Sequence, residues 1–335
     1  MDSTPPPRTP LMWRFMLLLA RLVVLPLCRL RVSGTVPADL RGRPLILAAN
    51  HVSPFDPIVM TAACHKAGIA PRIMATGGLF DAPIAGPAMR AAGHIRVDRN
   101  TTRVADALPA ATQALRDGAM VLLYPEGRIG LDPWMWPERG KTGVARMAAA
   151  AGAPVLPVAQ WGAHAVLPYT TPEHLLRSLL HAIRRRPVVH VRFGDTPIDL
   201  SGVTGTPGAQ AMQATRLIMD GIHDTLAALR PTEMQTPHHV DTTRPPDPSR
   251  VRPRRPAHPD KAPPEQANAG PAHPGQAHSE ETHPGPAAHP GPVHPGPADI
   301  GPADIGPADI GPADTGQAHP ERANTDNADT EKAQP

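Results

Sequence analysis

Short apolar runs alternate with amphipathic stretches over residues 43–230, and this alternation predicts the fold class. The apolar runs have the length of buried strands, and the amphipathic stretches have helical periodicity. The clearest segments, in chain order, are 44–50 (PLILAAN), 53–68, 119–127 (AMVLLYPEG), 141–152, 154–162, 188–194 (VVHVRFG) and 209–230. Such alternation is typical of an α/β domain. We therefore expect one domain with a mainly parallel sheet flanked by helices, and a site on loops that leave the carboxyl ends of strands.

Residues 11–30 form an apolar stretch that arginines interrupt. A helix that spans a bilayer needs ~20 consecutive apolar residues, but Arg14 and Arg21 break this stretch. They are seven residues apart and share one helix face. The pattern predicts an amphipathic helix in the lipid headgroup region with its arginines snorkelling to water, so residues 1–31 are interpreted as a membrane-associating segment. The alternative is an ordinary buried helix.

The composition changes near residue 231. Of the 46 prolines, 23 lie in residues 231–335, and no Phe, Trp or Tyr follows residue 230. Four tandem copies of Gly-Pro-Ala-Asp-Ile/Thr occupy residues 296–315. Because this stretch has little apolar surface to offset chain entropy, we expect residues 232–335 to be a disordered tail with an unknown partner, and residues 32–231 to be the folded domain.

The charge is divided between the same two parts. Residues 1–231 carry 25 Lys and Arg against 15 Asp and Glu, a net charge of +10, whereas 232–335 carry 8 against 15, a net charge of −7. The basic part suits an anionic partner, either a phosphate-bearing ligand or an anionic membrane surface. Nucleic acid is disfavoured because no zinc-ligand spacing, RNA-binding aromatic motif or basic zipper is present.

Metal and redox chemistry have little support in the sequence. The two cysteines, Cys28 and Cys64, lie in apolar contexts without metal-ligand or redox spacing, as suits a reducing, cytoplasmic setting. Histidines recur in the tail at 273, 278, 283, 289 and 294, but a flexible tract has no fixed ligand geometry. We expect no metal and no cofactor.

The segment Asn50-His51-Val52-Ser53-Pro54-Phe55-Asp56 follows an apolar run and has the spacing H-x-x-x-x-D. Ser53 and Pro54 predict a helix start with Ser53 as N-cap and Asp56 at the third position. His51 then lies in the preceding loop, which can fold it to within hydrogen-bond distance of Asp56. The alternative is that both residues only close a turn between a strand and a helix.

Three further segments accompany this one in a fixed order: Gly93-His94-Ile95-Arg96-Val97-Asp98-Arg99, Tyr124-Pro125-Glu126-Gly127 and Val155-Leu156-Pro157-Val158. Together the four segments resemble the four blocks of the glycerolipid acyltransferase family typified by 1-acylglycerol-3-phosphate acyltransferase. The similarity covers residues 45 to about 162, and the helix at 210–230 is similar to the closing helix of actinobacterial members.

The resemblance implies roles for individual residues. His51 and Asp56 match the catalytic pair of the family. The positions that match blocks associated with the acceptor and its phosphate are Gly93, Arg99, Glu126 and Gly127, and Pro157 matches an apolar block near the acyl donor. The third block departs from the common Glu-Gly-Thr-Arg-Ser, because Arg128 follows Gly127 directly. Arg128 is expected to reach the same phosphate.

The implied reaction is transfer of a fatty acyl group from acyl-CoA or acyl carrier protein to the sn-2 hydroxyl of 1-acylglycerol-3-phosphate, which forms phosphatidate. The expected location is the cytoplasmic face of the cell membrane, as a monotopic or peripheral protein. Other acceptors remain open, namely glycerol-3-phosphate, a lysophospholipid or a phosphatidylinositol mannoside. A different class also remains open, a membrane-bound interaction protein that acts through its Pro-rich tail.

Overall fold

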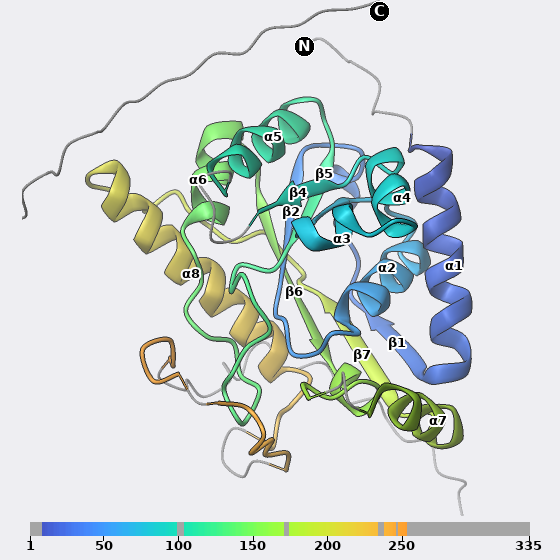
Figure 1. Ribbon diagram of the computed structural model, residues 1–335. Helices are drawn as coiled ribbons and strands as arrows, with labels where there is room; N and C mark the ends of the chain where they lie inside the picture. Colours follow the sequence, from blue (N-terminus) through green and yellow to red (C-terminus); the bar gives the residue numbers. More distant parts are fainter. Residues whose placement is uncertain (1–8, 99–103, 171–173, 234–237, 246, 253–335) are drawn as a thin grey trace, which may run out of the picture. The chain divides into compact units, whose positions relative to one another are not determined.

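The computed structural model describes residues 9–98, 104–170, 174–233, 238–245 and 247–252. Within these residues, seven strands form one sheet in the order β1-β7-β6-β2-β5-β3-β4 (Figure 1). The strands are β1 (Arg29–Ser33), β2 (Leu45–Ala49), β3 (Arg72–Thr76), β4 (Ile95–Val97), β5 (Met120–Leu123), β6 (Val155–Trp161) and β7 (Val188–Phe193). The tail repeats lie outside the described residues.

The sheet is mainly parallel, as the alternation of runs predicts. In the described part, β2 pairs in parallel with both β5 and β6, and β3 pairs in parallel with β4 and β5. The exception is β7, which runs antiparallel to β6 and parallel to β1. The carboxyl ends of β2 and β5 therefore lie at one edge, next to each other.

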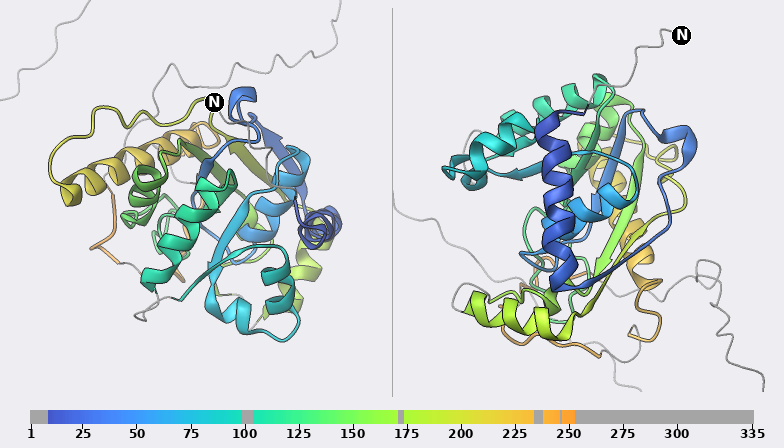
Figure 2. Two further views of the ribbon diagram at one scale, coloured as in Figure 1. Left: turned by 90° about the horizontal axis from the view of Figure 1, so that it is seen from above. Right: turned by 90° about the vertical axis from the view of Figure 1, so that its right-hand side faces the viewer.

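Helices cover both faces of the sheet (Figure 2). The helices are α1 (Leu11–Leu27), α2 (Asp56–Lys66), α3 (Gly77–Asp81), α4 (Ala85–Ala91), α5 (Val104–Arg116), α6 (Gly143–Ala151), α7 (Leu175–Arg185) and α8 (Pro207–Ala227). Strand β2 alternates between the two cores. Leu45 and Leu47 pack in the core under α1 and α2, whereas Ile46 and Ala48 pack in the core under α5, α6 and α8. A fully buried central strand results.

Helix α1 has two apolar faces. One face is buried, mainly against α2, and contributes Trp13, Leu17, Ala20, Val24 and Leu27 to the core. The other face exposes a second apolar stripe at i, i+4, i+7, i+11 and i+14, formed by Leu11, Phe15, Leu18, Leu22 and Leu25. Across the described residues, no helix combines the length and hydropathy needed to cross a membrane.

The chain continues to contact the domain beyond the predicted boundary at residue 231. Arg244 is fully buried, and its guanidinium donates hydrogen bonds to the carbonyl oxygens of Val52 and Gly130. Arg252 pairs with Asp220 of α8. The described residues from 238 to 252 therefore pack against the domain, although the sequence pattern assigned them to the tail.

Candidate functional site

The site is built on the loop that follows β2. Asn50 anchors the start of this loop through three hydrogen bonds to Gln160 of β6. The Asn50 side chain donates to the Gln160 carbonyl (3.0 Å) and accepts from the Gln160 amide (2.8 Å), while the Gln160 side chain donates to the Asn50 carbonyl (2.8 Å). Both residues are fully buried. The loop with His51 therefore leaves the sheet in a fixed direction.

His51 and Asp56 meet as the predicted loop geometry requires. Nδ1 of His51 lies 2.8 Å from Oδ2 of Asp56, and the same oxygen accepts N–H bonds from Val52 (2.6 Å) and Ser53 (2.8 Å). The Asp56 side chain is fully buried, and 11% of the His51 side chain is exposed. The His51 ring stacks on the Tyr124 ring, with the two ring centroids 4.2 Å apart. With Nδ1 held by the carboxylate, Nε2 is the nitrogen that can exchange a proton with a ligand.

The helix after His51 begins later than predicted. Asp56 is the first residue of α2 rather than its third, and the residue before it, Phe55, occupies the cap position. Ser53 does not cap this helix, because its hydroxyl accepts from the Phe55 amide and donates to the Leu167 carbonyl (2.7 Å). The turn at residues 53–55 thereby aims the Asp56 carboxylate back at the amides of the His51 loop.

Glu126 supports this loop from the neighbouring strand. It follows β5, is buried, and accepts hydrogen bonds from the amides of His51 (3.0 Å) and Glu138 (3.1 Å) through its two oxygens. Burial raises the pKa of the Glu126 carboxyl to about 8. Both oxygens are thus engaged with the protein backbone, and the acceptor contact that the resemblance implies stays a prediction.

The residues after Glu126 form a tight turn. Gly127 has a φ of +71°, a left-handed conformation that glycine adopts without strain, and its amide donates to the Tyr124 carbonyl. Arg128 pairs with two carboxylates, those of Glu138 (3.0 Å) and Asp247 (2.8 Å). Hydrogen bonds from the side chains of Ser249 and Arg128 lower the pKa of the Asp247 carboxyl. An anionic ligand at Arg128 would compete with both carboxylates.

The remaining predicted site residues lie in different surroundings. Gly93 forms a left-handed turn before β4, with a φ of +75°, and lines a polar hollow with Arg72 and Arg96. Arg99 lies outside the described residues. Pro157 lies in the middle of β6, paired in register with Ala48 of β2 and in close contact with Gly194. It is thus part of the sheet core.

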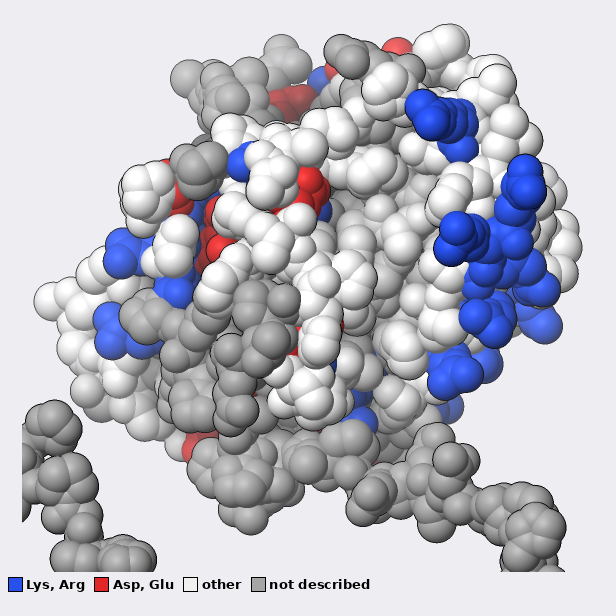
Figure 3. Space-filling view, turned by 90° about the horizontal axis from the view of Figure 1, so that it is seen from below, with Lys and Arg blue, Asp and Glu red and all other residues white. Residues whose placement is uncertain are grey.

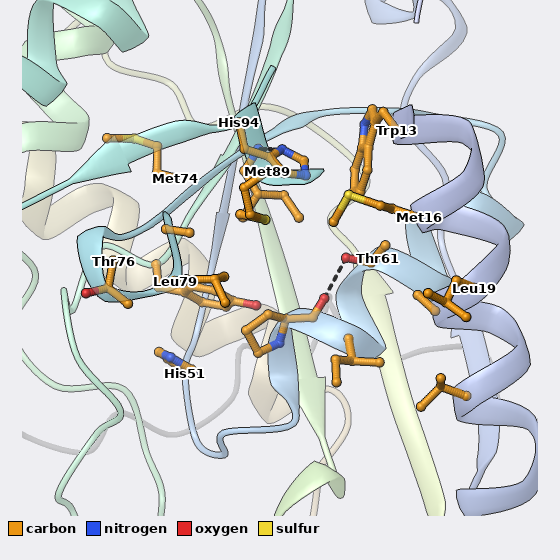
Figure 4. Close-up of a pocket in the computed structure, with 17 residues that line it drawn as sticks. Trp13, Met16, Leu19, His51, Thr61, Met74, Thr76, Leu79, Met89 and His94 are labelled. Carbon is orange, nitrogen blue, oxygen red and sulfur yellow. Dashed lines mark hydrogen bonds between the residues drawn. The ribbon is translucent and has the colours of Figure 1, made fainter. Parts of the chain in front are cut away.

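An apolar cavity of about 340 Å³ opens beside His51. Figure 4 shows His51 at one end and Trp13 and His94 at the other, with side chains of α1 and α2 along one wall. Ile73 donates its amide hydrogen to Nδ1 of His94, and burial lowers the pKa of His94 to about 4. His94 is therefore neutral near pH 7, so the described lining carries no formal charge apart from any proton on His51.

The cavity wall includes residues that the sequence pattern did not indicate. Trp13, Met16 and Leu19 of α1 line it together with Met89 of α4. The heptad-like spacing of the buried side of α1 could have indicated a core helix, but no local signal links that helix to His51. In the described part of the chain, no group of three His, Cys, Asp or Glu side chains is arranged to hold a metal ion.

Comparisons with known proteins find similarity to acyltransferases over the segment that carries this site. Residues 29–161 match the family model described as Acyltransferase. An uncharacterized protein of Mycobacterium tuberculosis is 30% identical over 161 residues, which is 45% of this chain and 42% of the relative. The chloroplastic 1-acyl-sn-glycerol-3-phosphate acyltransferase of Brassica napus is 25% identical over 150 residues, 44% of this chain and 42% of the relative. The match thus extends over about two fifths of the length of these curated relatives.

A solved structure is also similar. The 1-acyl-sn-glycerophosphate acyltransferase PlsC of Thermotoga maritima has a TM-score of 0.46 at 20% sequence identity, over 63% of this chain and 78% of that chain. The segment matched by the family model begins at β1, contains His51, Asp56 and Glu126, and ends at the last residue of β6. Residues 29–161, which carry these three side chains, are thus similar to acyltransferases.

Proposed function

We propose that the protein transfers a fatty acyl group from acyl-CoA or acyl carrier protein to the sn-2 hydroxyl of 1-acylglycerol-3-phosphate, forming phosphatidate. The observation that carries this proposal is the position of His51, at one end of an apolar cavity and hydrogen-bonded to a buried carboxylate. A base beside an apolar cavity suits a reaction in which a hydroxyl attacks a thioester that bears an acyl chain.

In the proposed reaction, His51 acts as general base. Nε2 takes the proton of the acceptor hydroxyl while the hydroxyl oxygen attacks the thioester carbonyl. The tetrahedral intermediate then collapses, the C–S bond breaks, and the imidazolium gives its proton to the departing thiolate. Asp56 keeps the other nitrogen protonated and stabilises the imidazolium that forms, in the manner of a buried aspartate in other acyl-transfer sites. A positioned base typically contributes ~10²–10⁴-fold to the rate. No protein nucleophile is needed, because the substrate supplies the hydroxyl.

The cavity is the proposed site of an acyl chain. Each buried methylene is worth about 0.8 kcal/mol, so an apolar cavity of this size can bind the chain tightly and orient its carbonyl toward His51. Leu19 and Val23 of α1 line the cavity and are also exposed at the surface. This arrangement supports entry of the chain through the side that α1 covers.

The acceptor headgroup is the proposed ligand of Arg99 and of the turn before β4. The resemblance assigns the phosphate to Arg99 and the Gly93 segment, and a guanidinium binds phosphate well through two parallel bonds. Arg128 is already paired with Glu138 and Asp247. A headgroup phosphate at Arg128 would therefore have to displace a carboxylate. A phosphatidylinositol mannoside, whose sugar hydroxyls lie away from its phosphate, is the second candidate acceptor.

We further propose that the protein binds the cytoplasmic face of the cell membrane through α1 and α7. Helix α1 exposes its second apolar stripe, and α7 buries only Ala182 while exposing Leu176 (71%) and Leu180 (54%). Figure 3 shows Lys and Arg side chains gathered on the right of the face seen from below, the side on which these helices lie in Figure 1. Apolar side chains beside exposed arginines suit an anionic lipid surface.

An acceptor panel tests the proposed activity. The purified full chain is incubated with labelled acyl-CoA, and separately with acyl carrier protein loaded with the same chain. Each donor is offered 1-acylglycerol-3-phosphate, glycerol-3-phosphate, a lysophospholipid or a phosphatidylinositol mannoside, and products are identified by mass spectrometry. Labelled phosphatidate supports the first candidate, and acylated mannoside supports the second. If none of the acceptors is acylated by either donor, the proposal is wrong.

A further inference from the structure

In the loop that carries His51, three successive peptide groups are each hydrogen-bonded through both the carbonyl oxygen and the amide hydrogen. In the first, the Asn50 carbonyl accepts from the Gln160 side chain (2.8 Å), and the His51 amide donates to Glu126 (3.0 Å). In the second, the His51 carbonyl accepts from the Gly130 amide (2.8 Å), and the next amide donates to Asp56. Because each group is bonded on both its oxygen and its nitrogen, the direction of the His51 backbone is fixed.

The third peptide group depends on a residue far along the chain. The Ser53 amide donates to Asp56 (2.8 Å), while the Val52 carbonyl of the same peptide group accepts from Nη2 of Arg244 (2.6 Å). A charged donor on the carbonyl polarises the peptide group and strengthens the bond that its N–H makes. Arg244 therefore acts on the same hydrogen bonds that orient the Asp56 carboxylate toward His51.

Arg244 also joins two loops. Its Nη1 donates to the Gly130 carbonyl (2.6 Å), and its Nε donates to Asp241 (3.0 Å). The Gly130 amide in turn donates to the His51 carbonyl. Only 1% of Arg244 is exposed, so this guanidinium is a buried charge balanced by Asp241. Its two carbonyl partners belong to the loop of His51 and to the loop that follows Glu126.

Neighbouring residues of the same segment contact the second loop. Arg250 donates to the carbonyls of Glu126 and Arg139, at 2.7 Å each. Asp247 pairs with Arg128 at 2.8 Å. The described residues of 238–252, here called the C-terminal strap, thus contact the loop 126–139 at several points as well as the His51 loop.

We propose that Arg244, alone among the arginines of the C-terminal strap, is a positioning residue for the His51–Asp56 pair. The inference rests on the proposed function only for its kinetic consequence. Without Arg244, the Val52 and Gly130 carbonyls lose their charged donor, and the loop can relax away from the geometry that presents Nε2 to the substrate. A small misplacement of a catalytic group lowers kcat more than it weakens substrate binding.

Full-length variants test this proposal. Arg244→Ala removes both carbonyl bonds, and Arg244→Lys keeps the charge but can bond to fewer acceptors because it lacks the guanidinium fork. Arg252→Ala is the matched control, since Arg252 belongs to the same strap and pairs with Asp220 of α8. Thermal unfolding identifies variants that fold. Hydrogen exchange of the amides of residues 51–53 reports on the loop without any need for activity.

The expected result is a separation between these variants. Arg244→Ala should lower kcat by about ten-fold or more while the KM of donor and acceptor stays within about two-fold, and Arg244→Lys should lie between it and wild type. Exchange at residues 51–53 should become about ten-fold faster in Arg244→Ala, and that at α6 should not change. Arg252→Ala should match wild type in both measurements.

Two results would overturn the proposal. One is hydrogen exchange at residues 51–53 that matches wild type in a folded Arg244→Ala variant. If the alanine variant does not fold, the same result in a folded Arg244→Lys variant would overturn the proposal. The other is an equal loss in Arg244→Ala and Arg252→Ala, which would mean that the strap contributes stability alone. The exchange measurement stands even if the wild-type chain acylates no acceptor, so failure of the proposed function remains distinguishable from failure of the strap.

Discussion

Oδ2 of Asp56 accepts the Nδ1–H of His51 at 2.8 Å while it also accepts the amide hydrogens of Val52 and Ser53. One carboxylate oxygen therefore orients the imidazole and fixes the backbone of the loop that carries it. The two roles can be separated, because an asparagine oxygen can still accept hydrogen bonds but carries no negative charge to stabilise an imidazolium.

Asp56→Asn should accordingly lower kcat by about 10²–10⁴-fold while the protein remains folded. The KM of the acyl donor should change little, because Asp56 is fully buried and does not face the cavity. Steady-state kinetics and circular dichroism of the two proteins provide the comparison. A variant with near wild-type kcat would show that the charge of Asp56 has no part in the reaction.

The apolar cavity should set the length of the acyl chain. Ala75 of β3 lines it, and Ala75→Leu adds three carbons to its wall. Since each methylene of the chain that is excluded forfeits about 0.8 kcal/mol, the preferred acyl chain should become shorter, while transfer of a short chain is retained. Competition between acyl-CoAs of different length measures the shift. Ala209→Leu, on the exposed start of α8, is the control and should leave the preference unchanged.

The two faces of α1 should respond differently to substitution. Leu18→Gln combined with Leu22→Gln, on the exposed stripe, should weaken binding to anionic vesicles by about ten-fold or more, with little change in stability. Trp13→Ala, on the buried face, should instead destabilise the fold by about 3–5 kcal/mol. Vesicle flotation and urea unfolding separate the two effects. Vesicle binding that survives the double glutamine substitution would exclude this stripe as the lipid contact.

Stability should fall on the acid side of neutrality because of His94. Burial lowers the pKa of His94 from an unperturbed value of 6.5 to about 4, so the unfolded chain takes up its proton at a higher pH than the folded protein does. The free energy of unfolding that neutral His94 preserves is fully present above pH 6.5. It is lost as the pH falls toward 4, and the loss is on the order of 3 kcal/mol.

His94→Gln should remove this part of the pH dependence, because an amide oxygen can still accept from the Ile73 amide but does not titrate between pH 4 and 7. Urea unfolding of both proteins at pH 7 and pH 4.5 measures the change in the free energy of unfolding between these pH values. The buried His164, with a pKa lowered to about 3, changes stability in the same direction in both proteins, so the difference between them isolates His94. Equal pH dependence in the two proteins would contradict the assignment.

The fold was predictable wherever a local pattern determines it. The apolar run at β2 and the H-x-x-x-x-D spacing after it predict a central strand and a loop that brings His51 to Asp56, and both are present. The exact helix start was not predictable, because the Ser53 hydroxyl bonds to Leu167, more than one hundred residues away, rather than capping α2.

Other features depend on contacts that no local pattern contains. Glu126 matches a family block for the acceptor, and in the fold its buried carboxyl group accepts the backbone amides of His51 and Glu138, which would otherwise lack a partner there. Arg244 lies in a Pro-rich stretch whose composition predicts disorder, and only the folded chain brings its guanidinium to Val52 and Gly130. Residue type alone could not indicate either role.

The most direct test of the account is the rate of acyl transfer by His51→Ala. The purified variant and wild type are incubated with labelled acyl-CoA and 1-acylglycerol-3-phosphate, and labelled phosphatidate is quantified after separation. We predict product from wild type and a rate at least about 10²-fold lower from the variant, whose fold and vesicle binding should match wild type. A variant that kept more than about a tenth of the wild-type rate would have lost less than ~1.4 kcal/mol of transition-state stabilisation, and His51 would then not be the base.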